Sequence, residues 1–158
     1  GSLDDITVDD WDKTLRANLT SAMFGAKYQL PEIAKRGGGS VIFTSTFVGH
    51  TIGMPGMTAY AASKMGLLGM AQCLAVEHGG ANIRVNALVP GGTDTPMAAS
   101  FTSDPETRAM VEKFHALGRI ADPSEIAKAA LFLASDASSF VTGSAMLVDG
   151  GTSICKAA

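Results

Sequence analysis

A tyrosine and a lysine stand four residues apart in the stretch Tyr60-Ala-Ala-Ser-Lys64. Residues at this spacing lie on the same face of a helix. A free phenol has a pKa of about 10 and is a poor proton donor or acceptor near neutral pH. A lysine cation about 5 Å away favours the phenolate by roughly 3 kcal/mol at an effective dielectric near 20. The spacing therefore suits general acid/base catalysis by the phenol.

The same two residues could instead be structural, with the Tyr60 ring packed in the core and Lys64 solvated on a helix. Their neighbours favour the chemical interpretation, because most of them are small. Small side chains let a backbone or a flat ligand approach a helix closely. These neighbours are Ala59, Ala61, Ala62, Ser63, Gly66 and Gly69.

The periodicity of the chain predicts the elements that position this pair. Apolar residues at three- and four-residue spacing predict a helix over about 10–35, and a second helix is predicted over 58–78. Wholly apolar runs at 41–43 and 83–89 are typical of buried parallel strands. The first of these runs ends in Thr44-Ser45-Thr46 and the second in Pro90-Gly91.

The last third of the chain is predicted to hold a flap, a helix and a strand. Residues 93–118 are polar, rich in methionine and weakly helical, which suggests a mobile flap. Asp122 and the proline that follows it begin a helix to about residue 134, and 145–148 form a strand. Strands that alternate with helices predict an α/β fold in which helices cover both faces of a parallel sheet. We expect a single domain over residues 1–158.

The composition excludes several classes of partner. The chain has 158 residues, of which 46% are hydrophobic and 17% charged, so it can bury a core. Its net charge of −3, without basic clusters, disfavours nucleic acid, and no apolar run is long enough for a membrane span. The two unpatterned cysteines, Cys73 and Cys155, suggest free thiols in the cytoplasm, with Cys73 in the core. The three histidines lack metal-ligand spacing, so we expect no metal site.

The tyrosine–lysine motif, preceded by a strand that ends in hydroxyl residues, resembles the short-chain dehydrogenase/reductase family. The likeness spans essentially the whole chain and is nearest to the 3-oxoacyl-[acyl-carrier-protein] reductase-like members. Further segments match the family's pattern in order along the chain. They are Asn18-Leu19, Ile83–Gly91, Leu117–Arg119 with Asp122-Pro123, Phe132–Ser135, and Val141–Gly143 with Val148–Gly151.

The resemblance implies an NAD- or NADP-dependent oxidoreductase that interconverts a carbonyl and an alcohol by hydride transfer. Tyr60 would exchange a proton with the substrate oxygen. Lys64 would lower the pKa of that phenol and bind the nicotinamide ribose. Asn18 would anchor a water in the proton relay.

The resemblance also implies a cofactor site and indicates what the sequence lacks. Pro90, Gly91 and Thr93 would present backbone groups to the nicotinamide carboxamide, and Thr95 would add its hydroxyl. The family's glycine-rich loop does not occur in this sequence. We therefore expect the C-terminal part of a doubly wound, Rossmann-type domain without its glycine-rich N-terminal half. The choice between NAD and NADP stays open.

Two adjacent hydroxyls could polarise the substrate. Counting back from Gly49 places the family's serine at Thr46, but the distance to Tyr60 is then one residue longer than usual, as if the intervening loop held an insertion. Side chains alternate along a strand, so only one of Ser45 and Thr46 can face the site. We favour Thr46, and Ser45 remains the alternative.

The expected substrate is a small alcohol or ketone, or an acyl thioester. The resemblance further implies a homodimer or homotetramer. The competing hypothesis is a non-catalytic family member that acts as a binding or scaffold module. The intact set of Asn18, Tyr60 and Lys64 argues against it.

Overall fold

The computed structural model describes residues 1–155, apart from the side chain of Phe101. Its strands form one parallel sheet in the order β1-β2-β3, with bounds β1 Gly39–Thr44, β2 Ile83–Pro90 and β3 Ala145–Val148. Parallel neighbours cannot be joined by a hairpin, so each connection crosses over the sheet through a helix. The predicted parallel sheet is confirmed.

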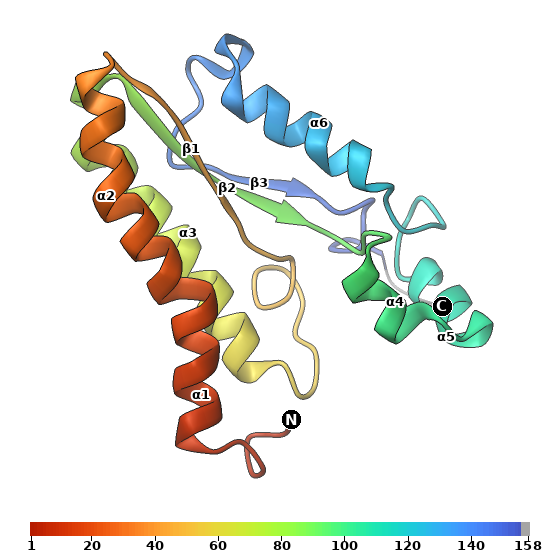
Figure 1. The fold of residues 1–158 in the computed structure, drawn as a ribbon. Helices are drawn as coiled ribbons and strands as arrows, with labels where there is room; N and C mark the ends of the chain where they lie inside the picture. The colour runs from red at the N-terminus through yellow and green to blue at the C-terminus, as the bar shows by residue number, and fades with distance from the viewer. Residues whose placement is uncertain (156–158) are drawn as a thin grey trace.

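Helices cover both faces of the sheet (Figure 1). One face carries α3, Thr58–His78, beside a long helical segment made of α1, Val8–Leu15, a π-helical turn, Arg16–Thr20, and α2, Ser21–Lys35. The opposite face carries α6, Pro123–Ala134. Short 3-10 turns at Gly79–Ala81 and Asp136–Ser138 follow α3 and α6.

The first helical segment departs from the prediction of one regular helix over 10–35. It begins earlier, because Thr7 caps α1 in a capping box with Asp10. It is also interrupted by the π-helical turn, where α3 approaches closely. A Cβ on Gly66 of α3 would come within 2.7 Å of the Leu19 side chain. The missing side chain at Gly66 therefore allows the π-helical turn to pack directly on α3.

The core lies between β2 and the α2–α3 pair. Ile83 and Val85 of β2 are fully buried, and Leu67 of α3 packs in the same cluster as Leu30 of α2. Small residues line much of this interface, which lets helix and sheet approach closely. The prediction that Cys73 belongs to the core is wrong, because this side chain is exposed. The spacing of apolar residues alone does not show which side of this apolar helix faces the sheet.

The segment predicted as a flap is folded into two short helices. They are α4, Pro96–Thr102, and α5, Pro105–Lys113, each capped by the side chain just before it, Thr95 and Asp104. The start of α6 agrees with the sequence prediction, since Asp122 forms a capping box with Glu125.

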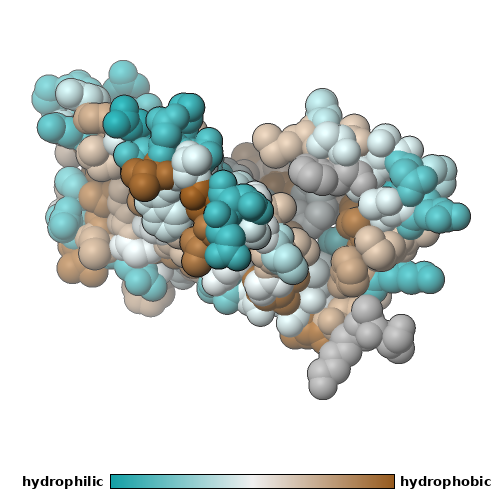
Figure 2. Space-filling view, turned by 90° about the horizontal axis from the view of Figure 1, so that it is seen from below, coloured by the Kyte–Doolittle hydropathy of each residue, from teal (hydrophilic) through white to brown (hydrophobic). Residues whose placement is uncertain are grey.

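Several large hydrophobic side chains reach the surface, as the brown areas among hydrophilic residues in Figure 2 illustrate. Some lie on α2, and others lie on α6 and β3. The exposed members of these two groups are Met23, Phe24, Tyr28, Leu131, Phe132 and Leu147. An open apolar groove of about 270 Å³ also runs between α2 and α3. Exposed apolar surface of this kind commonly marks an interface.

Candidate active site

The ends of β1 and β2 bring together two of the predicted site segments. Beyond β1, the Ser45 N–H donates to the Leu88 carbonyl at 2.8 Å, and the Phe47 N–H donates to the Pro90 carbonyl at 3.3 Å. This continued ladder places Thr46 beside the carboxyl end of β2. In open α/β sheets, ligands bind outside this edge.

Lys64 reaches from α3 to the end of β1. Its Nζ donates to the Thr44 carbonyl at 2.9 Å and lies 6.0 Å from the centre of the Tyr60 ring. Partial burial lowers the pKa of Lys64 from its ordinary value of 10.5, since desolvation disfavours the cation. Two of the three ammonium N–H groups remain for other partners. The predicted one-face arrangement of Tyr60 and Lys64 is thus present.

Asn18 lies in the π-helical turn and contacts the same part of α3. Its Nδ2 donates to the Ser63 hydroxyl at 3.0 Å, and that hydroxyl donates to the Tyr60 carbonyl at 2.7 Å. Ser63 is fully buried. Single π-helical turns inside α-helices occur frequently at functional sites. Asn18 therefore contacts the first two turns of α3, which carry Tyr60 and Lys64.

The two candidate hydroxyls are bonded differently. The Ser45 hydroxyl donates to the Lys64 carbonyl at 2.8 Å and is committed to holding α3. The Thr46 hydroxyl accepts a 3.3 Å bond from the Val48 N–H, which leaves its own proton uncommitted. Both side chains are buried. Because a hydroxyl has a single proton, only the Thr46 hydroxyl has a proton left to donate.

The residues predicted to meet the cofactor follow β2. The Gly91 N–H donates to the Val148 carbonyl at 3.0 Å, and a Cβ at this position would lie 2.6 Å from the Asp149 backbone. The Thr93 hydroxyl donates to the Gly91 carbonyl at 3.1 Å. The Thr95 hydroxyl accepts from the backbone of α4 as its N-cap. Thr93 and Thr95 thus form hydrogen bonds within their own segment.

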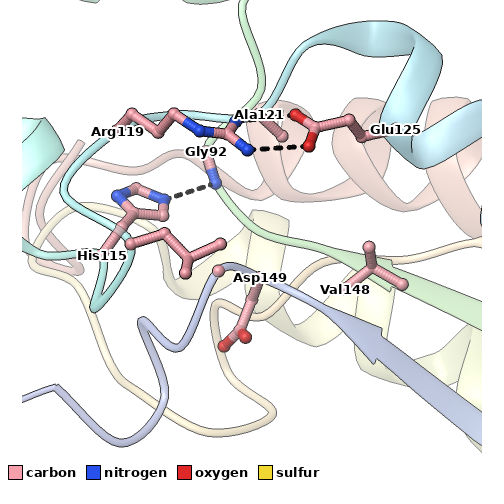
Figure 3. A pocket seen from close by; sticks show the side chains of 9 residues that line it. Gly92, His115, Arg119, Ala121, Glu125, Val148 and Asp149 are labelled. Carbon is pink, nitrogen blue, oxygen red and sulfur yellow. Dashed lines mark hydrogen bonds and ion pairs between the residues drawn. The ribbon is translucent and has the colours of Figure 1, made fainter.

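A small cavity of about 90 Å³ adjoins this loop, and the side-chain interactions at its wall were not predicted from the sequence (Figure 3). His115 Nε2 accepts a 3.1 Å bond from the Gly92 N–H. Arg119 forms a bidentate ion pair with Glu125 at 2.7 and 2.8 Å. The hydrogen bonds from Arg119 lower the pKa of Glu125 from 4.5 to about 2. The His115 contact joins residues 23 apart in the chain, so no local pattern could reveal it.

The part of the chain that the structure describes shows neither a metal-binding cluster nor a membrane-spanning helix. Within residues 1–155, no three histidine, cysteine or acidic side chains are grouped so as to hold a metal ion. None of the helices described there combines the length and apolar character that a membrane crossing requires.

Comparison with known proteins gives concordant matches. The family model for enoyl-(acyl carrier protein) reductase matches residues 1–153. The 3-oxoacyl-[acyl-carrier-protein] reductase FabG of Thermotoga maritima is 41% identical over 143 residues, which are 90% of this chain and 57% of that protein.

Solved structures agree with this assignment. A Burkholderia xenovorans protein assigned to the short-chain dehydrogenase/reductases matches with a TM-score of 0.88 and 35% identity, covering 97% of this chain and 58% of its own. A gluconate 5-dehydrogenase from Burkholderia cenocepacia, solved with NADP and tartrate, matches with a TM-score of 0.90 and 29% identity over 96% and 59% of the two chains.

This chain therefore spans somewhat less than 60% of the length of these three proteins. Its parallel sheet with flanking helices is the Rossmann-type architecture of these neighbours. The Tyr60–Lys64 motif lies on α3 of this architecture. The chain belongs to the short-chain dehydrogenase/reductase family of oxidoreductases.

Proposed function

We propose that this chain forms the catalytic part of an NAD- or NADP-dependent oxidoreductase that interconverts a carbonyl and an alcohol. One observation carries the proposal. Tyr60 and Lys64 lie on one face of α3 against the carboxyl end of β1, with the ammonium 6.0 Å from the phenol ring and bonded to the Thr44 carbonyl. This arrangement places a positive charge beside the phenol that would exchange the proton.

In the proposed reaction, Tyr60 gives a proton to the carbonyl oxygen during reduction and takes it back during oxidation. Lys64 supplies the positive charge that makes this exchange possible near neutral pH. Thr46 donates its uncommitted proton to the same substrate oxygen, which stabilises the negative charge that develops there. Ser45 remains the alternative donor, but its proton is directed at the Lys64 carbonyl.

Asn18 is proposed to serve the proton relay. Its amide is anchored to Ser63, and Ser63 in turn is bonded to the Tyr60 carbonyl. These bonds fix the π-helical turn relative to the catalytic turn of α3. Asn18, held in place by these bonds, would then anchor a water of the proton relay.

The donors at the sheet edge fit a nicotinamide cofactor. Lys64 has N–H groups left for ribose hydroxyls. Within the described residues, the Thr93 N–H donates to no acceptor. With Pro90 and Gly91, Thr93 offers the peptide groups that a carboxamide requires, and Thr95 adds a hydroxyl. NAD or NADP, when bound, supplies or removes the hydride. The Burkholderia cenocepacia relative was solved with NADP.

The proposed substrate is a small alcohol or ketone, or an acyl thioester. The named relatives include a 3-oxoacyl-[acyl-carrier-protein] reductase and a gluconate 5-dehydrogenase, so both chemistries occur among them. The segment 93–118, with α4 and α5, is proposed to form a mobile wall of the substrate pocket. The fold is compatible with more than one class of substrate, because the substrate class varies among these relatives.

We also propose that the protein assembles as a homodimer or homotetramer. The apolar groove between α2 and α3 and the exposed side chains on α6 and β3 offer two separate faces for assembly. Burial of apolar surface stabilises association. Light scattering on the whole protein should give a mass of two or four chains, and a strict monomer would contradict this proposal.

The function is tested by incubating the whole protein with NADH or NADPH and a panel of ketones, hydroxy acids and 3-oxoacyl thioesters. Loss of the reduced nicotinamide absorbance with at least one carbonyl is the expected result. A folded protein that turns over no member of the panel with either cofactor would instead support the scaffold hypothesis.

A further inference from the structure

We infer that His115 is a positioning residue that sets the direction of the Gly91 carbonyl, through a hydrogen bond to the Gly92 backbone. The inference rests on the proposed function, in which the loop after β2 meets the nicotinamide carboxamide. His115 follows α5, so the bond ties the wall segment 93–118 directly to that loop.

The two partners of the His115 ring define its tautomer. Nε2 lies 3.1 Å from the Gly92 N–H, which can only donate. Nδ1 lies 2.9 Å from the Val111 carbonyl, which can only accept. The ring is therefore neutral, with its proton on Nδ1 and an acceptor lone pair on Nε2. An imidazolium has no acceptor nitrogen and could not make the bond to Gly92.

The ring lies directly against the backbone it holds. His115 is 5% exposed, and a Cβ on Gly92 would come within 2.8 Å of its Nε2 and Cε1 atoms. Only glycine allows this contact. On the other side of the same residue, the Gly92 carbonyl accepts a 2.8 Å bond from the Ala121 N–H. Both polar groups of Gly92 are thus fixed.

Because the peptide group is planar, the two hydrogen bonds of Gly92 also fix the direction of the backbone groups next to it. In a trans peptide, the carbonyl of one residue points opposite to the N–H of the next. Because the Gly92 N–H points to His115, the Gly91 carbonyl points away from His115. By the same rule, the Thr93 N–H points away from Ala121. These are two of the backbone groups proposed to bind the carboxamide.

The charged groups around the ring are already engaged. Arg119 and Glu125 are paired with each other, and the Asp149 carboxylate accepts bonds from the Gly151 and Ser153 backbone N–H groups. In Figure 3 the Asp149 carboxylate points away from the His115 ring.

On α5 itself, Glu112 is paired with Arg108. Among the described residues, the hydrogen-bond partners of the imidazole are backbone groups, and none of them is charged. No ion pair therefore holds the ring, and its contact with Gly92 depends on the acceptor nitrogen.

The test compares His115→Leu, which cannot accept a hydrogen bond, with His115→Gln, whose carbonyl can accept one and does not titrate. His78→Leu, at the far end of α3, is the matched control. Each whole protein is assayed for the KM of NADH and NADPH, for kcat and for calorimetric cofactor binding.

We expect His115→Leu to raise the cofactor KM and Kd by about three- to tenfold, as loss of one hydrogen bond predicts, with a smaller change in kcat. His115→Gln should recover most of the affinity.

An active wild type with an unchanged KM in His115→Leu would overturn this inference alone. A wild type that neither binds the cofactor nor turns over any carbonyl would overturn the proposed function as well. If His115→Leu does not fold, His115→Asn decides, because its shorter side chain lacks an acceptor at the Nε2 position, and an unchanged cofactor KM in that variant contradicts the inference.

Discussion

The side-chain amide of Asn18 is joined to the hydroxyl of Ser63 by a 3.0 Å hydrogen bond between residues 45 apart in the chain. The Ser63 hydroxyl in turn donates to the Tyr60 carbonyl at 2.7 Å. The π-helical turn thus holds the turn of α3 that carries the phenol. Preorganisation of this kind supports catalysis, because small displacements of a catalytic group cost rate steeply.

Replacement of Lys64 should impair both cofactor binding and turnover. In Lys64→Met, the side chain keeps about the same length but loses its charge and its hydrogen bond to the Thr44 carbonyl, so Tyr60 loses the cation beside its ring. We expect turnover to fall at least about 100-fold and the cofactor Kd to rise, measured by steady-state kinetics and calorimetry.

Lys27 provides a matched control, since its Nζ lies 5.9 Å from the Tyr28 ring on the surface of α2. Lys27→Met should leave both quantities unchanged. A Lys64→Met protein with normal cofactor affinity and a normal pH profile would show that Lys64 is an ordinary helix residue.

Removal of each of the two hydroxyls after β1 should have a different effect on turnover and on the free energy of unfolding. Thr46→Ala should cost about 2–4 kcal/mol in the transition state, as loss of an oxyanion donor does, and Thr46→Ser should restore much of it. Ser45→Ala should change turnover little but lower the free energy of unfolding by about 1 kcal/mol, because it removes the bond to the Lys64 carbonyl. The reverse pattern would show that Ser45 is the substrate-polarising residue.

Much of this fold could be predicted from the sequence where local signals were strong. The α3 helix follows its predicted bounds of 58–78, and Asp122 and Glu125 form the capping box that their spacing indicates. The π-helical turn at Arg16–Thr20 was not predicted, because periodicity over a long segment averages out one irregular turn.

The candidate site was predicted only where motifs are local. Tyr60 and Lys64 are four residues apart, so helix geometry alone places them together. The bond between His115 and Gly92 depends on how the chain returns to the sheet, and spacing does not encode it. Whether Ser45 or Thr46 offers a proton likewise depended on tertiary contacts, since both hydroxyls are buried at the same strand end.

The Arg119–Glu125 pair should contribute to stability in a pH-dependent manner. The pKa of Glu125 is lowered from 4.5 to about 2 in the folded chain, chiefly by hydrogen bonds from Arg119. A depressed carboxylate pKa stabilises the folded state above the unfolded value, and this contribution is lost as the pH falls through the folded value. Glu125→Gln should therefore be less stable than the wild type at pH 7, and the difference should shrink between pH 4.5 and 2.

Thermal unfolding of both proteins across this pH range checks the expectation. Glu77→Gln is the control, because Glu77 has no ion-pair partner in the described part of the chain. A difference that stays constant down to pH 2 would show that the ion pair contributes nothing to acid stability.

The proposed role of Tyr60 is the central claim, and Tyr60→Phe tests it most directly. The substitution removes one hydroxyl and leaves the ring, so packing on α3 changes little. Tyr28→Phe is the matched control, because Tyr28 is the only other tyrosine and its side chain is exposed on α2.

The decisive measurement is carbonyl reduction by the whole protein, with NADH and NADPH binding measured by calorimetry on the same preparations. The account predicts that Tyr60→Phe binds the cofactor with nearly wild-type affinity but loses almost all turnover, while Tyr28→Phe retains both. A Tyr60→Phe protein that keeps a substantial share of the wild-type turnover would contradict the account.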